Sequence, residues 1–505
     1  MQPAPGHTFQ SRKEPHPNNK PNQIREKLMS LQTQTGKKKS SQCRIIPHAD
    51  APLVILALMF SALLVTAARA STLIDPQPED STTRFGQSLA VVGDINGDGV
   101  PDLVVGGPFH DSEFSGNNGF GPPQDVGRAF LINGATLGEI SELNDPFFQQ
   151  PLDFPKFGGF FGFSVAALGD INHDGVPDVL VGVPHHSNFD ADHINAGECF
   201  VFSGADHSIL FTLLDPNEEE GNRFGYAVAG LGDVNGDGIP DMAVGVPKKN
   251  ASDDLPDVGA VYIFSGANGT MIRELDPPTQ DLSGRFGSAV ANAGDVNHDG
   301  VNDVLIGAPG ASKAYVFNGA TGAVIFTIRS PGSRGADRLP SFGAAVAGGQ
   351  DLDADGTPDF VIGAPNQKNL QGAAYVFKGS DGSLLFRLRG PRQGFAKFGT
   401  SVALTPDVTG DGRPDILVGA PDATVNGLRN AGEVLIFSGS NGTLFSTVTS
   451  EEPKAYAGFG YAVTTADFNG DGTPETVIGV PFDDEDIIVN GDVETHLQIG
   501  KIEVH

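Results

Sequence analysis

Acidic residues recur in this chain at a spacing that suits a metal ion. Seven nine-residue segments follow the form Asp-x-Asn-x-Asp-Gly-x-x-Asp, except that position three is Asp in the fifth and Thr in the sixth, and position nine is Glu in the seventh. Oxygen ligands at alternate positions, with a glycine at position six that permits a sharp turn, match the requirements of Ca²⁺. We therefore predict up to seven calcium sites.

The predicted ligands occupy positions one, three, five, seven and nine, and position seven contributes its carbonyl oxygen, so that its side chain is free to vary. The ligands are Asp94, Asn96, Asp98, Val100 and Asp102; Asp170, Asn172, Asp174, Val176 and Asp178; Asp233, Asn235, Asp237, Ile239 and Asp241; Asp295, Asn297, Asp299, Val301 and Asp303; Asp351, Asp353, Asp355, Thr357 and Asp359; Asp407, Thr409, Asp411, Arg413 and Asp415; and Asp467, Asn469, Asp471, Thr473 and Glu475. Position twelve carries no glutamate, so the segments are not EF-hands. Instead, the acid at position nine would close each site from the start of the next strand.

A single segment of this kind would be an ordinary Asp-Gly turn, whereas seven copies in register favour metal binding. The sixth segment is the weakest candidate, because Thr409 is a poorer ligand than Asn. Six segments with three carboxylates and one with four would repel themselves without bound cations. Calcium is therefore predicted to be a structural component of the fold.

Each acidic segment belongs to a longer unit that occurs seven times. A unit runs from a Phe-Gly pair through a short apolar stretch, the acidic segment, a second apolar stretch ending in Gly-x-Pro, a third stretch, a Gly-rich turn and a fourth stretch. Short stretches rich in Val, Ile, Phe and Tyr between Gly, Asp and Asn turns predict strands and hairpins. No sustained 3.6-residue period predicts helix. The expected fold is all-β, a seven-bladed β-propeller of four-stranded antiparallel blades.

The two ends of the repeated region predict how the propeller closes. The seventh unit ends at residues 501–505, which match a third strand, and no fourth strand follows. Residues 71–76 resemble residues 211–216, a fourth strand, and both lead to Arg-Phe-Gly. We therefore predict that the N-terminal strand of the mature chain completes the last blade.

Residues 1–70 have the order of a signal peptide, with a long basic region, an apolar run over residues 51–68 and the small-x-small sequence Ala68-Arg69-Ala70. We predict its removal, which leaves residues 71–505 as the propeller without a membrane span. An uncleaved anchor helix is the alternative, and initiation at Met29 would shorten the basic region. The mature chain would keep 22 of 32 basic and 59 of 62 acidic residues. Such a surface repels nucleic acid and anionic membranes.

Cysteine usage predicts no intramolecular disulfide. Cys43 lies in the predicted signal peptide, and Cys199 lies in an apolar strand where other units carry Val or Ala, so it is expected to be a buried thiol. A secreted protein without disulfides needs another source of stability for its fold.

The Phe-Gly pair, the acidic segment and Gly-Ala-Pro, as in Gly307-Ala308-Pro309, resemble FG-GAP repeats, and residues 71–505 resemble the propeller head of integrin α subunits. The resemblance implies an extracellular propeller that binds calcium in hairpin loops on its lower face and contacts ligands and partners with its upper face. Two departures limit what it implies. All seven segments are near-complete here, whereas integrins carry the full loop in only some blades. The stalk, membrane span and cytoplasmic tail are missing, so heterodimeric receptor behaviour is not carried over.

The face opposite the acidic segments is the expected ligand surface. The loops after Gly-x-Pro and before the next Phe-Gly are longest in blades seven, one, two and three, and long loops on a rigid scaffold are common binding sites. These loops contain Phe109, Phe114, Phe120, Phe147, Phe148, Phe154 and Phe189. The alternative is that these rings only pack their own loops. A transition-metal site formed by His110, His185, His186 and His193 is a weaker alternative, because they lack a fixed ligand spacing.

We therefore predict a secreted or cell-surface, monomeric module that binds a protein or glycan ligand for adhesion and is not an enzyme. A hydrolase is the weaker alternative, because Gly-x-Ser-x-Gly and His-Glu-x-x-His are missing. A lectin or matrix-binding protein would differ only in ligand chemistry and stays open. Asn250, Asn268 and Asn441 begin glycosylation motifs, although the last two also fit hairpin turns.

Overall fold

Four-stranded antiparallel sheets are the repeated unit of the structure. A computed structural model describes residues 71–76, 82–110, 126–146, 158–187, 195–217, 219–252, 254–331, 341–489, 492–496 and 498–505. The predicted signal peptide lies outside these residues. None of the helices described within them is long and apolar enough to cross a membrane.

The seven sheets follow one another along the chain, each with four strands. Blade one has β2 (Ser88–Gly93), β3 (Asp102–Gly107), β4 (Arg128–Ile132) and β5 (Glu139–Leu143); blade two has β6 (Ser164–Gly169), β7 (Asp178–Val183), β8 (Glu198–Phe202) and β9 (Ile209–Leu214); blade three has β10 (Ala227–Gly232), β11 (Asp241–Val246), β12 (Ala260–Phe264) and β13 (Met271–Leu275). Blade four has β14 (Ala289–Gly294), β15 (Asp303–Ala308), β16 (Lys313–Phe317) and β17 (Val324–Arg329); blade five has β18 (Val346–Gln350), β19 (Asp359–Gly363), β20 (Ala374–Phe377) and β21 (Leu384–Leu388). Blade six has β22 (Val402–Thr405), β23 (Asp415–Ala420), β24 (Glu433–Phe437) and β25 (Leu444–Val448); blade seven has β26 (Ala462–Ala466), β27 (Glu475–Val480), β30 (Lys501–Val504) and β1 (Ser71–Ile74).

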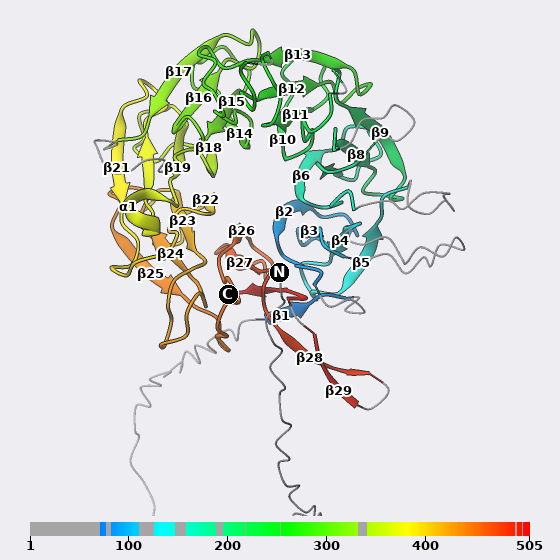
Figure 1. The fold of residues 1–505 in the computed structure, drawn as a ribbon, viewed down its shortest axis with the longest axis vertical. Helices are drawn as coiled ribbons and strands as arrows, with labels where there is room; N and C mark the ends of the chain where they lie inside the picture. Colours follow the sequence, from blue (N-terminus) through cyan, green and yellow to red (C-terminus); the bar gives the residue numbers. More distant parts are fainter. Residues whose placement is uncertain are drawn as a thin grey trace, which may run out of the picture. The chain divides into compact units, whose positions relative to one another are not determined.

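The sheets form a ring, with the first strand of each blade innermost and the fourth outermost (Figure 1). Each first strand contacts the first strand of the next blade, and β26 contacts β2. These innermost strands are rich in Gly and Ala, whose small side chains allow neighbouring backbones to approach closely. The predicted seven-bladed propeller is confirmed.

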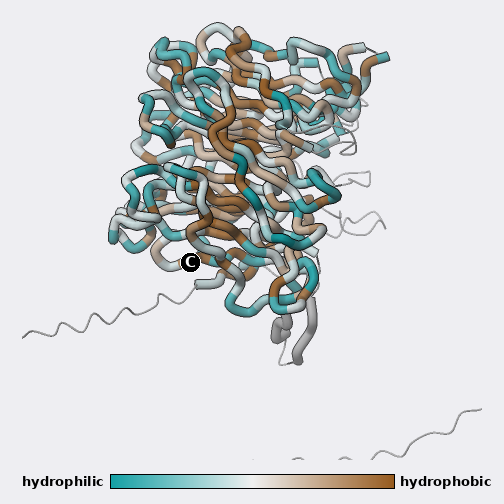
Figure 2. Tube along the Cα trace, turned by 90° about the vertical axis from the view of Figure 1, so that its left-hand side faces the viewer, coloured by the Kyte–Doolittle hydropathy of each residue, from teal (hydrophilic) through white to brown (hydrophobic). Residues whose placement is uncertain are grey.

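The core is divided among the interfaces between blades. Seven buried apolar clusters each combine residues from two neighbouring blades, and the cluster at the closure joins blade seven to blade one. Figure 2 shows apolar chain inside the blades and polar chain at many of the outer turns. Because each blade buries its faces only against its neighbours, the stability of any one blade depends on a closed ring.

The Phe-Gly and Gly-x-Pro motifs form the close contact between successive blades. The Phe side chains of all seven pairs are at most 1% exposed. A Cβ atom added to Gly106, Gly307 or Gly479 would lie 2.0 Å from the carbonyl oxygen of the glycine in the next Phe-Gly pair. Only glycine leaves room there, so both motifs are requirements of blade packing.

The last blade closes as the sequence predicts. Strand β1 pairs antiparallel with β30, with Ser71 opposite Val504 and Ile74 opposite Lys501. Immediately after β1, the buried carboxylate of Asp75 accepts a hydrogen bond from the Thr83 hydroxyl. The propeller therefore joins its first and last strands inside one sheet.

Two further elements interrupt the repeat. Strands β28 (Glu485–Val489) and β29 (Asp492–His496) form a separate antiparallel hairpin between β27 and β30, where the sequence analysis expected only a long loop. The dipeptide Asn490-Gly491 between them is a strong hairpin signal that could have revealed it. In blade five, α1 (Gln367–Leu370) is a short helical segment with positive φ at Lys368 and Asn369.

Candidate metal centres

The seven acidic segments all connect the first and second strands of their blades, so they lie at equivalent places in the repeat. The glycine at position six has φ between +83° and +91° in every copy, as the sequence analysis expected. Position four also has positive φ, including at His173, His298 and Ala354. Residues with side chains disfavour this conformation. The glycine found at position four in four of the loops therefore indicated a second left-handed residue, which was not predicted.

The acid at position one folds the segment around itself. In the first loop, Asp94 accepts hydrogen bonds from the N–H groups of Gly97 at 2.7 Å and Gly99 at 2.8 Å. The position-six N–H makes the same bond in all the other loops, for example from Gly356 to Asp351 at 2.9 Å. Each loop therefore holds its first carboxylate at the centre of a turn of backbone.

The acid at position nine is the first residue of the second strand and is fully buried in the first six loops. In the fifth loop, Asp359 accepts hydrogen bonds from the N–H groups of Leu352 at 2.9 Å and Gly379 at 2.9 Å. Burial raises the pKa of Asp303 and Asp359 to about 6, despite these hydrogen bonds. A buried carboxylate beside other acids is electrostatically unfavourable, and a bound cation would relieve this.

The turn between the third and fourth strands reaches back to the loop and carries a residue that the sequence analysis missed. The side chain of Asn133 donates to Asp98 at 2.7 Å, and that of Ser438 donates to Asp411 at 2.6 Å. Ser203 and Asn318 donate to the position-five acid in the same way, Lys378 forms an ion pair with the position-three acid Asp353, and the Ser265 hydroxyl accepts a hydrogen bond from the Asn235 side chain. The polar residue directly before the glycine of that turn recurs in the first six blades, which was the available signal. The two hairpin turns of these blades therefore lie on one face of the propeller.

The donor set fits a hard divalent cation, and the carboxylates converge most closely in three loops. Single ligand oxygens lie within 4.8 Å of one another in Asp351, Asp353 and Asp359; in Asp407, Asp411 and Asp415; and in Asp467, Asp471 and Glu475. The first four loops do not bring three acids together this closely; in two of them Asn133 and Asn318 hold the position-five acid. Calcium ligation by all 35 predicted residues remains a prediction, as does the weaker binding expected of the sixth loop.

Comparison with known proteins identifies the repeat. A family model described as FG-GAP repeat matches residues 85–122, 161–193, 224–264, 286–326, 342–377, 398–437 and 459–495, more than half of the chain. The chain belongs to the FG-GAP repeat family. Its Phe-Gly pairs lie shortly before the first strand of each blade, and its acidic loops lie within the matched residues.

The chain is also similar to integrin alpha subunits. The chain is 34% identical to integrin alpha-5 of Xenopus laevis over 217 residues, which are 41% of this chain and 20% of that protein. It is 32% identical to integrin alpha-V of Gallus gallus over 237 residues, 44% of this chain and 22% of that protein. The chain therefore spans about a fifth of the length of these relatives.

The opposite face of the FG-GAP propeller is described only in part. Phe109 packs against Phe160, with ring centroids 4.7 Å apart, and the Arg84 guanidinium lies 4.0 Å from the centroid of the Phe109 ring. Phe160 also contacts His185. Phe114, Phe120, Phe147, Phe148, Phe154 and Phe189 lie outside the described residues, so a shared surface formed by these loops stays a prediction.

The histidines named as an alternative metal site in this FG-GAP propeller have other surroundings. His186 is buried and faces Glu198 at 3.2 Å and Asp145 at 3.8 Å. Burial lowers the pKa of His185 to about 4. Within the described part of the chain, no cluster of three metal-ligating side chains includes His110, His185 or His186, and His193 lies outside that part. Cys199 is a buried free thiol, as expected.

Proposed function

We propose that this chain is an extracellular, calcium-stabilised ligand-binding module of the adhesion type. The observation that carries the proposal is the recurrence of one oxygen-lined loop at the same position in seven blades of an FG-GAP propeller similar to integrin alpha subunits. In this proposal residues 1–70 are removed as a signal peptide, and residues 71–505 act as a monomer. The proposed role is binding and not catalysis, in keeping with those relatives.

The proposed calcium ligands are those at positions one, three, five, seven and nine of each loop. A bound calcium ion would supply positive charge to carboxylates that the fold already holds together, such as Asp351, Asp353 and Asp359. The carboxylate at position one orders the loop by accepting hydrogen bonds from N–H groups of the loop backbone, and the acid at position nine connects the loop to the second strand. The ion would thereby fasten each first hairpin and stiffen the blade.

The size of this effect can be estimated by mass action. Extracellular calcium modules have dissociation constants of about 10⁻⁴–10⁻³ M. If free calcium is about ten times higher, each site contributes about 1.4 kcal/mol to the free energy of unfolding. Seven sites would contribute about 10 kcal/mol, comparable to the stability of a whole domain. At about 1 °C per kcal/mol for a domain of roughly 430 residues, chelation should lower the melting temperature by about 10 °C.

The test has two parts. Isothermal titration calorimetry measures calcium binding to the purified chain, and thermal denaturation with and without EGTA measures the effect of calcium on the melting temperature. We expect several calcium ions per chain and the stated drop in melting temperature. Magnesium at the same concentration serves as the control, because its small octahedral shell suits these loops poorly. A melting temperature that is indifferent to EGTA would contradict the calcium proposal.

The ligand is proposed to bind the face opposite the metal loops, over blades seven, one, two and three. Replacing residues 109–126 and 185–195 with the three-residue turn Gly310-Ala311-Ser312 of blade four should abolish ligand capture and leave the calcium-dependent melting unchanged. Capture of surface proteins compared with binding to a glycan array would distinguish a protein ligand from a glycan. Capture that survives both replacements would contradict this location.

A further inference from the structure

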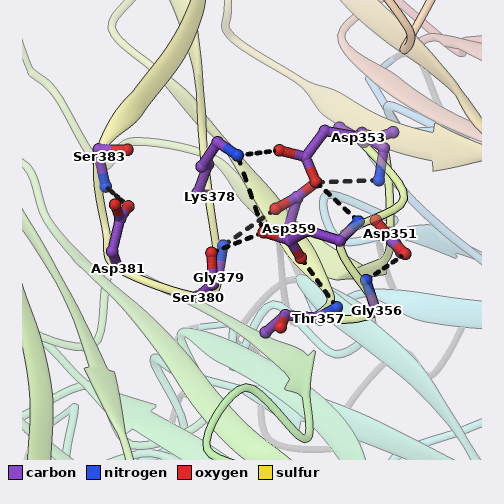
Figure 3. A network of polar contacts seen from close by, with 12 residues as sticks. Asp351, Asp353, Gly356, Thr357, Asp359, Lys378, Gly379, Ser380, Asp381 and Ser383 are labelled. Carbon is purple, nitrogen blue, oxygen red and sulfur yellow. Dashed lines mark hydrogen bonds and ion pairs between the residues drawn. The ribbon is translucent and has the colours of Figure 1, made fainter.

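Blade five contains a lysine at its metal loop. Lys378 follows β20, and its ammonium group forms an ion pair with Asp353 and lies 3.7 Å from Asp355 (Figure 3). The Lys378 side chain is 31% exposed, and those of Asp353 and Asp355 are 16% and 27% exposed. The ammonium therefore lies at the edge of the loop, in contact with a carboxylate that is also a proposed calcium ligand.

The internal copies of the repeat show that this lysine and one of its partners are both exceptions. Position three is Asn in five loops and Thr in one, and only the fifth loop has an acid there, Asp353. The turn residue before glycine is Asn or Ser in the other five blades that have the turn, and only blade five has Lys. The additional negative charge of Asp353 and the positive charge of Lys378 thus occur in the same blade. Together they give the fifth loop and its turn the same net charge as a loop with three acids.

The backbone that carries Lys378 is the same as in the other blades. The Lys378 N–H donates to Ser383 at 2.9 Å, and its carbonyl accepts from Gly382 at 2.9 Å; in blade six, Ser438 makes the same two bonds at 2.9 Å and 2.8 Å. Both turns also place the following glycine N–H on the position-nine acid, at 2.9 Å for Asp359 and 3.0 Å for Asp415. The difference between the two blades is therefore one of side chains on a common scaffold.

We propose that Lys378 is a tethered counter-ion, which keeps the fifth loop folded when calcium is withdrawn and lowers the affinity of that loop for calcium. The inference rests on the proposed calcium function. An ammonium group and a calcium ion compete for the same Asp353 carboxylate, and their like charges repel at short range. Blade five would then be the part of the ring whose metal face stays ordered at low calcium.

The experiment compares the wild-type chain with Lys378→Ser, which gives blade five the turn residue of blades two, three and six. Calcium binding is measured by isothermal titration calorimetry, and loop order by hydrogen exchange in EGTA. We expect the substitution to strengthen calcium binding at the fifth loop about tenfold, the scale of removing one unit charge a few ångströms from a divalent ion at a solvated site. In EGTA, we expect residues 351–359 to exchange about tenfold more slowly than residues 407–415 in the wild type, and at similar rates in the variant.

Two controls keep the outcomes separable. Lys397→Ser removes a lysine that pairs with Asp422 at 2.9 Å in the loops of the opposite face, and it should leave calcium binding nearly unchanged, whereas Ser438→Lys should weaken calcium binding at the sixth loop. A wild-type chain that binds no calcium would overturn the proposed function itself. A wild-type chain that binds calcium, with affinities and exchange rates unaltered by Lys378→Ser, would overturn only the role of Lys378.

Discussion

The packing of successive blades predicts that Gly307→Ala destabilises the propeller. The added Cβ would lie 2.0 Å from the carbonyl oxygen of Gly343 and 2.9 Å from its carbonyl carbon. Both contacts are to backbone, so no side-chain rotation can relieve them, and blades four and five must separate by about 1 Å to restore an ordinary contact.

The magnitude follows from the cost of overpacking. Forcing extra atoms into a packed core typically destabilises a protein by about 1–3 kcal/mol, and a contact between two backbones belongs at the upper end. Unfolding entropy of about 2.1 cal/mol/K per residue gives roughly 0.9 kcal/mol/K for this propeller. We therefore expect differential scanning calorimetry to record a melting temperature about 3 °C below the wild type.

A matched glycine provides the control for this experiment. Gly394 lies in the link between blades five and six, and a Cβ added there meets no atom within 4 Å. Gly394→Ala should leave the melting temperature within about 1 °C of the wild type, since no contact is lost or strained. If Gly307→Ala and Gly394→Ala had the same melting temperature, close packing between blades would not explain the glycine of this motif.

Further predictions concern the closure of the ring. Deleting residues 71–76 removes the four-residue pairing of β1 with β30 and should lower the melting temperature by about 4 °C, at about 1 kcal/mol for each lost hydrogen bond; an unchanged melting curve would count against closure by β1. Burial acts to raise the pKa of Glu503 in β30, but contacts with His505, Ser450 and Lys501 outweigh it and lower this pKa to about 2. The ionised carboxylate thus stabilises the fold above about pH 4.5, and this contribution is lost as the pH falls towards 2. Between pH 5 and pH 3 the melting temperature should therefore fall more steeply in the wild type than in Glu503→Gln, and parallel curves would refute this role.

The repeat made the fold predictable from the sequence, because seven imperfect copies average out the ambiguity of any one strand. The Phe-Gly pairs, the Gly-x-Pro endings and the match between residues 71–76 and a fourth strand were enough to predict the blade order and the closing strand. The position of each acidic loop followed from the same repetition. These predictions depended on the constant order and similar spacing of the motifs within each unit, because a single short apolar stretch does not identify a strand reliably.

The sequence alone does not reveal the contacts between elements that lie far apart in the repeat. Asn133 and Lys378 act on carboxylates 35 and 23–25 residues away, and only the folded hairpins bring these groups together. The hairpin of β28 and β29 was not predicted, because an insertion of this length is typical of a loop, although its Asn-Gly sequence indicates a hairpin turn. His298 and Ala354 have left-handed φ angles, which residues with a side chain rarely adopt. The fold around these residues, and not their own conformational preference, therefore sets their backbone conformation.

The strand pair between β1 and β30 has a consequence for how the protein is made. Ser71 and Val504 are hydrogen-bonded neighbours in one sheet but are translated more than 400 residues apart. At about 5–20 residues per second, the early strand waits roughly 20 to 90 s for its partner. During synthesis blades one to six can stack in order, while the faces of blades one and six that pack against blade seven stay uncovered. The nascent chain is therefore an open arc with two apolar ends until its final residues emerge, and this is the stage at which a chaperone would protect it best.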